Sequence, residues 1–365
     1  MATRNAKYVK KYGAEQAAAV ARFEAANVLA VKQLVEREKI DCDFVLTRAL
    51  DVYLNEEHAK ATNEAYRELA ELGDVNLADV HYTEGQNAEK LSGVKGAKSC
   101  YSFTAAHLWP YKLVMHLLGL LMEKNVNLQT HTPVLLVSEI PDASGHWTVT
   151  TARGTVAAKK VVFATNGYTA AILPQFHEKI VPVRGICSRI VAQDAAKTQR
   201  LSNSYSLRYG QAEYDYMIAR LDGSIVVGGA KTRFWDDITN WYGVTDDSKL
   251  IEPAADYFDG LMQRHFSGWE HSGARTDQVW TGIMGWSSDF MPYVGEVPDK
   301  PGQFIIAGFS GHGMPLIHLS STALASIVGE VSTFAETRLP SVFKPTRERL
   351  RSPVNEILGI PAARL

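Results

Sequence analysis

The 365-residue chain has few cysteines and no long apolar run. Cys42, Cys100 and Cys187 are far apart, form no CxxC pair and have no histidine at metal-ligand spacing. We therefore expect neither a disulfide framework nor a metal site. No apolar run approaches the roughly 20 residues of a membrane helix, and the opening MATRNAKYVKKYG has no apolar signal core. These absences predict an intracellular, soluble protein without a membrane partner.

An excess of charge is missing as well. The formal net charge is only −2, which gives no electrostatic reason to expect a nucleic-acid partner. Hydrophobic residues make up 46% and charged residues 21%, so neither disorder nor a fibrous repeat is indicated. The length suits one large domain or two ordinary domains that share a cleft, with a small molecule as the expected partner. The oligomeric state is left open.

Helical and extended patterns alternate in the first third of the chain. The alanine-rich segment 14–39 places apolar residues at helical spacing, and DFVLTRALDVYLN then predicts a strand. A charged helix is predicted from Glu56 to about Leu72, ended by Gly73. WPYKLVMHLLGLLMEK predicts another helix that begins at its proline, where a first turn accepts proline readily.

The rest of the chain predicts two sheets. Short strands follow one another over 126–165, and a second sheet is expected from about 181 to 233, with a hairpin at LDGS. LIEPAADYFDGLMQRHF predicts a helix, after which the chain returns through strand QFIIA to a final helix. The first layer is thus left, another sheet is built, and the first layer is re-entered.

The stretch GFSGHGMP at 308–315 follows strand QFIIA directly and precedes the final helix. A glycine-rich turn between a strand and a helix leaves backbone N–H groups and a positive helix end free for a ligand. Its glycines also remove side chains that would block a flat or phosphorylated group. The alternative is a tight turn with no ligand at all.

Six segments occur in the same order as in one known family. They are AHLWPYKL, LQTHTPV, VVFATNGY, PVRG, WTGIMGWSSDFMPYVG and IIAGFSGHGMP. Together they resemble the D-amino-acid-oxidase-like (DAO) family of FAD-dependent oxidoreductases, in particular its fungal-type members. The resemblance implies an α/β protein with an incomplete Rossmann-like FAD-binding domain, formed by 1–180 and 275–365. An antiparallel-sheet substrate domain would be inserted at 181–274.

The resemblance also implies contacts to non-covalently bound FAD, because TGIMG lacks the cysteine by which some members attach flavin. Val134 would touch the adenine, and three residues would line the nucleotide: Thr165, Asn166 and Gly167. The residues that would face the isoalloxazine are Gly308, Phe309, Gly311, His312, Gly313 and Met314. N–H donors there would stabilise the negative charge of a reduced flavin.

The sequence departs from the family in two ways. No GxGxxG turn, which holds the FAD pyrophosphate in the family, occurs in it. Either it is a truncated or mis-spliced copy of a flavoenzyme, or it works without tightly bound FAD. Met284 and Pro315 stand where family members carry an arginine or a lysine for a substrate carboxylate. This predicts a larger or less acidic amine as substrate.

Three residues are the candidates for catalysis, each with a structural alternative. Arg184 could favour reduced flavin or bind an anionic group, or it could be an ordinary salt-bridged arginine at a strand end. His312 could act on substrate or only fix its turn. Tyr216, which alternates with Tyr214 on a strand, could line the substrate pocket or pack against the sheet.

The expected function is FAD-dependent oxidation of a C–N bond in an amine or amino-acid-derived compound, with oxygen as acceptor. One alternative is a cofactor-free remnant that acts as a binding or partner protein. Another is a flavin-dependent biosynthetic oxidoreductase with a different acceptor. The final Ala-Arg-Leu resembles the peroxisomal Ser-Lys-Leu signal, so a peroxisomal or a cytoplasmic location is expected.

Overall fold

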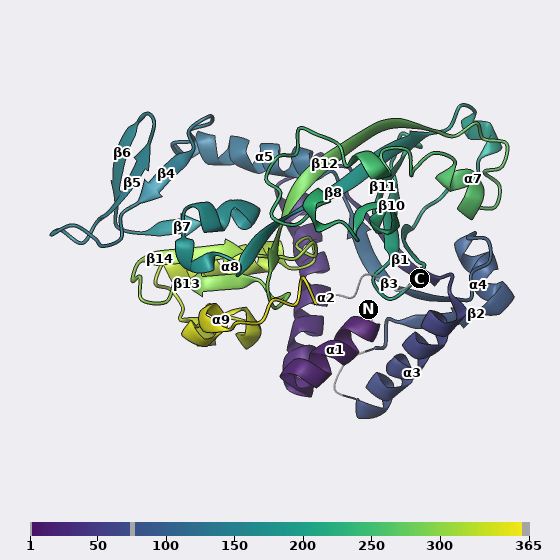
Figure 1. The fold of residues 1–365 in the computed structure, drawn as a ribbon, viewed down its shortest axis with the longest axis horizontal. Coiled ribbons are helices and arrows are strands. Elements are labelled where there is room, and N and C mark those ends of the chain that lie inside the picture. The colour runs from purple at the N-terminus through teal and green to yellow at the C-terminus, as the bar shows by residue number, and fades with distance from the viewer. Residues whose placement is uncertain (1, 74–76, 360–365) are drawn as a thin grey trace.

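The computed structural model describes residues 2–73 and 77–359, which form one large sheet and two small ones (Figure 1). The large sheet has eight strands in the order β12-β8-β11-β10-β9-β1-β3-β2. Their bounds are Val45–Tyr53 for β1, His81–Glu84 for β2, Ser99–His107 for β3, Ile180–Val191 for β8, Ser204–Arg208 for β9, Tyr214–Ala219 for β10, Ile225–Gly228 for β11 and Arg275–Ser287 for β12. Its neighbours are antiparallel, except that β1 runs parallel to β9.

This sheet is not confined to 181–274. Strand β1 joins it through a parallel pairing of Ala49 with Ser204, and β12 joins it at the other edge by pairing with β8. The sequence predicted β1 as an extended segment but carries no information about which distant strand it pairs with, and it did not predict β2 or β3. The division of the chain into two domains stays a prediction.

The two small sheets lie together at the other end of the molecule (Figure 1). One contains β13 (Tyr293–Glu296), β14 (Gln303–Ala307) and β7 (Val161–Phe163), with β14 parallel to β7. The other is an antiparallel sheet of β4 (Val134–Val137), β5 (Trp147–Thr151) and β6 (Gly154–Ala158). Because β7 and β14 run in the same direction, the segments that follow them, which begin near Thr165 and Gly308, leave the sheet at the same edge.

All but the first of the longer helices lie where the sequence predicts a helix, whereas the first was not predicted. The longer ones are α1 (Ala2–Tyr12), α2 (Ala14–Arg37), α3 (Glu56–Leu72), α5 (Pro110–Glu123) and α8 (Ile317–Val328). The shorter ones are α4 (Gly85–Ser92), α6 (Lys231–Phe234), α7 (Leu261–His265) and α9 (Arg347–Arg351). The side chain of Asn55 caps α3 by accepting from the His58 N–H at 2.9 Å, and Gly73 ends it with φ 71°. No helix among the described residues is long and apolar enough to span a membrane.

The single long helix predicted over 250–266 is wrong. A 3-10 turn forms at Glu252–Ala254, and the α-helical part is only α7. Gly260 separates the two with φ 67°, a left-handed conformation that interrupts a right-handed helix. The apolar residues of this segment are buried nonetheless, since Phe258 and Leu261 belong to the main core beneath the large sheet.

The two faces of the large sheet differ. On β10, Asp215 and Met217 point into the core, whereas Tyr214 is partly buried and Tyr216 is 46% exposed. Arg208 of β9 lies opposite Tyr214 in the antiparallel register and so shares its face. We call this second face, which carries Arg208, Tyr214 and Tyr216, the open face.

Candidate flavin and substrate site

Three segments that are distant in sequence meet where β7, β12 and β14 end. The Gly308 N–H donates to Asn166 Oδ1 at 3.0 Å, and the Ser310 N–H donates to the Gly285 carbonyl at 2.8 Å. A Cβ on Gly285 would lie 2.5 Å from Asn166 Oδ1 and 2.6 Å from the Gly167 nitrogen. The structure thus brings Asn166, Gly167 and Gly308 together, at a junction with no room for a further side chain.

The turn after β14 presents hydrogen-bond donors that have no partner. Ser310 and Gly311 have φ values of 54° and 69°, so the chain folds back before α8 begins. Within residues 2–73 and 77–359, the amides of Gly311, Gly313 and Met314 meet no hydrogen-bond acceptor. The indole Nε1 of Trp286 is buried and equally unpartnered, 3.4 Å from where a Cβ on Gly311 would be. Donors without acceptors fit a ligand edge that carries oxygen, such as the pyrimidine carbonyl of a flavin.

Helix α2 supports this turn from behind. His312 Nε2 lies 3.1 Å from Oε1 of the buried Glu24, and the His312 N–H donates to the Phe309 carbonyl at 2.9 Å. Asn27 bridges the turn and α8, since its Nδ2 donates to the Met314 carbonyl and its Oδ1 accepts from the Leu319 N–H. These contacts show His312 fixing the turn, and a catalytic role for it stays a prediction.

The predicted nucleotide-lining residues lie on neighbouring elements. Val134 on β4 packs against the hydrophobic cluster that contains Phe163 of β7. Thr165 follows Phe163 by two residues, and its Oγ1 lies 2.9 Å from Oγ1 of Thr169 in the 3-10 helix η1 (Asn166–Ala171). Val134 is therefore brought to the same cluster as the end of β7, without a described hydrogen bond to Thr165.

Arg184 and Tyr216 lie on the large sheet rather than at the turn. Arg184 donates to the Asn240 carbonyl at 2.9 Å through Nε, and its N–H donates to the Trp241 carbonyl, so it fastens the loop after α6 to β8. The Tyr216 ring covers Gly228, where a Cβ would come within 2.3 Å of the ring, and its hydroxyl lies 3.5 Å from Cys187 Sγ. Tyr216 lies on the open face and packs over Gly228, and catalytic roles for both residues stay predictions.

A lysine that the sequence analysis missed lies beside Trp286. Lys231, the first residue of α6, places Nζ 4.3 Å from the ring centroid of Trp235, 5.1 Å from that of Trp286 and 5.2 Å from that of Tyr214. Burial lowers the pKa of this ammonium group. The Lys231–Trp235 spacing of four residues is the one signal in the sequence that hints at a cation–π contact. The other two rings are distant in sequence and arrive only through the fold.

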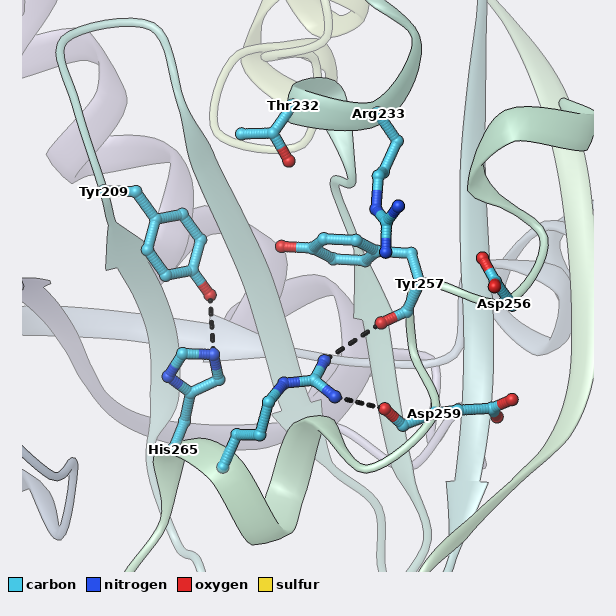
Figure 2. Close-up of a pocket in the computed structure, with 8 residues that line it drawn as sticks. Tyr209, Thr232, Arg233, Asp256, Tyr257, Asp259 and His265 are labelled. Carbon is cyan, nitrogen blue, oxygen red and sulfur yellow. Dashed lines mark hydrogen bonds between the residues drawn. The ribbon is translucent and has the colours of Figure 1, made fainter. Parts of the chain in front are cut away.

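An open pocket of about 470 Å³ lies on the side of the large sheet opposite the open face (Figure 2). Its lining residues are Tyr209, Thr232, Arg233, Asp256, Tyr257, Asp259, Arg264 and His265. Figure 2 shows the Tyr209 hydroxyl directed at the ring of His265, at 3.4 Å. The buried Asp215 accepts from the hydroxyls of Tyr209 at 3.0 Å and Tyr257 at 2.7 Å, and burial raises its pKa.

Comparison with known proteins identifies the class. The family model described as DAO, FAD dependent oxidoreductase, matches residues 2–327, and the chain belongs to this family. The expected family and the expected mixed α/β fold are thereby confirmed. No metal-binding cluster of His, Cys, Asp or Glu occurs in the part of the chain that the structure describes.

Three relatives illustrate the similarity. Glycine oxidase of Bacillus licheniformis is 24% identical over 201 residues, 54% of this chain and 48% of that protein. Gamma-glutamylputrescine oxidoreductase of Escherichia coli strain K12 is 22% identical over 354 residues, 94% of this chain and 76% of that protein. The crystal structure of glycine oxidase from Geobacillus kaustophilus superposes with a TM-score of 0.72 at 18% identity, covering 91% of this chain and 83% of that one. The chain thus aligns with about half the length of the glycine oxidases, and the structural likeness shows a shared fold.

Proposed function

We propose that this protein is an FAD-dependent enzyme that oxidises a C–N bond of an amine or amino-acid-derived compound and passes the electrons to oxygen. Membership of the family supports the cofactor and the reaction class. The observation that carries the proposal is the set of unpartnered donors at Gly311, Gly313, Met314 and Trp286. Gly311 and Met314 are exposed, but the indole N–H of Trp286 is buried without an acceptor, and a turn that only reversed the chain would not need such a group.

Bound FAD would supply the hydride acceptor for the C–H next to the amine nitrogen. The chain's own residues would provide position and charge. The amides of Gly311, Gly313 and Met314, in the turn that leads into α8, would hold an oxygen-rich edge and favour negative charge there. The junction of Asn166 and Gly308 would keep that turn in place, because its hydrogen bond joins the ends of β7 and β14.

We propose that FAD is bound without a covalent bond. Cys42 and Cys100 are buried, and burial raises the pKa of the Cys100 thiol to about 12. Cys187 on β8 faces Tyr216, and burial raises its thiol pKa as well, so the reactive thiolate is disfavoured. At the position of the turn, β12 offers Met284 and Gly285 instead of a cysteine.

A second candidate is a cofactor-free binding protein, which the absence of a GxGxxG motif from the sequence favours. The location stays a proposal too: the Ala-Arg-Leu motif lies outside the described residues, and both a peroxisomal and a cytoplasmic location are compatible with it. Hydrogen peroxide formed when oxygen accepts the electrons would make a peroxisomal address chemically sensible.

The visible spectrum of the purified 365-residue chain, with and without added FAD, separates the two candidates. We expect absorbance bands near 370 and 450 nm, roughly as for any protein-bound oxidised flavin. Oxygen consumption with a panel of amines then tests the acceptor, with an artificial electron acceptor as the comparison. A colourless protein that does not bind added FAD would support the cofactor-free candidate instead.

A further inference from the structure

We propose that Lys231 anchors a carboxylate of the substrate, so that the substrate is an amino acid or an N-substituted amino acid rather than a simple amine. This inference rests on the proposed function and names its substrate class. It replaces the expectation of a less acidic amine, which followed from the uncharged side chains of Met284 and Pro315. The charge is supplied by a different element, α6 of the large-sheet region.

The surroundings of Lys231 contain rings and donors but no counter-ion. Tyr214, Trp235 and Trp286 surround Nζ at 4.3 to 5.2 Å, and their π faces favour a cation without accepting its N–H groups in full. Across the described ranges, Nζ has no carboxylate at ion-pair distance and no hydrogen-bond acceptor. An ammonium group carries three donors. A bound carboxylate would pair with them and would favour the charged form of the lysine.

The neighbouring cation is already neutralised. Arg208 on the open face donates to Asp51 at 3.2 Å and stacks over Tyr214 at 4.7 Å. Asp51 is buried, and although burial alone would raise its pKa, nearby positive charge that includes Arg208 holds the pKa below its ordinary value. Arg208 thus has a resident partner, whereas Lys231 is available to a ligand.

Lys231 also adjoins the turn after β14. The indole of Trp286 contacts Nζ through its ring and approaches Gly311 through its unpartnered Nε1. The donors of the turn and the ammonium group are therefore separated by a single side chain. This places an anchor for a negative group next to the position where the amine would be oxidised, which is what positioning of a substrate C–H requires.

The backbone of Lys231 is held firmly from the pocket side of the sheet. The Ala230 N–H donates to Asp215 Oδ1 at 2.9 Å, and Gly229 lies so close that a Cβ there would be 2.1 Å from the same oxygen. Tyr209 and Tyr257, both shown in Figure 2, hold the other oxygen of Asp215. A buried network thus fixes the backbone just before Lys231, which lowers the cost of ordering this segment on binding.

A matched pair of ligands tests the anchor. Phenylacetate and phenylacetamide have nearly the same shape, but only the first is an anion. We expect isothermal titration of the FAD-supplemented protein to show at least about tenfold preference for phenylacetate, as for one charge-assisted contact. Lys231→Met and Lys231→Gln should lose this preference, whereas the control Lys249→Met, which removes an exposed lysine of the same charge, should keep it.

Other results overturn the anchor. Lys231 does not bind the carboxylate if the wild type shows no preference for phenylacetate over phenylacetamide. The same follows if folded Lys231→Met and Lys231→Gln keep that preference. Circular dichroism establishes that each variant is folded. Turnover separates the two proposals. An amine oxidase whose KM for carboxylate-bearing amines is unchanged in Lys231→Gln would overturn the anchor alone, whereas a protein that prefers phenylacetate but oxidises no amine would overturn the proposed activity.

Discussion

Replacing Gly285 with alanine would strain the junction that joins the two ends of the candidate flavin site. The added methyl group would lie 2.5 Å from Asn166 Oδ1, 2.6 Å from the Gly167 nitrogen and 2.8 Å from the Asn166 carbonyl carbon. Two of these three atoms are backbone, which cannot rotate away, so the strand or η1 must shift. Overpacking of this kind costs about 2 kcal/mol of the free energy of unfolding.

Gly282 offers the matched control on the same strand. A Cβ there meets no atom within 4 Å, and neither glycine has a positive φ. Gly282→Ala should therefore leave stability unchanged or raise it by about 0.5 kcal/mol, because alanine restricts the unfolded chain. The assay is urea unfolding followed by tryptophan fluorescence, with flavin absorbance as a second readout.

The shift of η1 should reach the turn through the bond between Asn166 Oδ1 and the Gly308 N–H. We therefore expect Gly285→Ala to weaken FAD binding as well as stability, and Gly282→Ala to do neither. If the free energies of unfolding of the two variants, obtained from their urea curves, differ by less than about 0.5 kcal/mol, the contact at Gly285 is not tight and the reasoning fails.

Two further predictions concern buried polar groups. Burial raises the folded-state pKa of Asp215 above 3.8, so this carboxyl contributes stability that is present below the unfolded pKa and is lost as pH rises through the folded pKa. Urea unfolding between pH 3.5 and 7 should show that the free energy of unfolding depends less on pH in Asp215→Asn than in the wild type. An unchanged dependence on pH would contradict this account. His312→Ala removes one hydrogen-bond partner of the buried Glu24, so it should lower the melting temperature and weaken FAD binding, measured by flavin fluorescence during titration. Unchanged FAD affinity would show that the pair does not support the turn.

Local signals in the sequence predicted what depends on local physics. Helix α3 begins after Asn55 and ends at Gly73 because a side-chain cap and a left-handed glycine act on their own neighbours. The turn at 308–313 was predicted for the same reason, since strand, glycines and helix are consecutive in the chain. The hairpin between β10 and β11 follows the same rule, with the Arg220 N–H donating to the Ser224 carbonyl.

Features that depend on distant contacts were missed. The apolar residues around Gly260 predicted a helix because both a helix and a broken chain can bury them, and only packing under the large sheet decides between the two. The environment of Lys231 is assembled by β10, α6 and β12, whose order in space no spacing reveals. Arg184 was predicted from its place in PVRG, but its carbonyl partners come from a loop more than fifty residues away.

The parallel pairing of β1 with β9 also constrains how the chain folds. Residues 49 and 204 must meet before the strands β1, β3 and β2 can join the rest of the sheet. Contacts between residues so far apart carry a high entropic cost of loop closure, and they slow folding. During synthesis, the first three strands would be complete long before β9 emerges, and the edge of β1 would stay exposed in the interval. The pairing of β1 with β9 in the middle of the sheet is therefore the folding step before which the partly folded chain is most prone to aggregate.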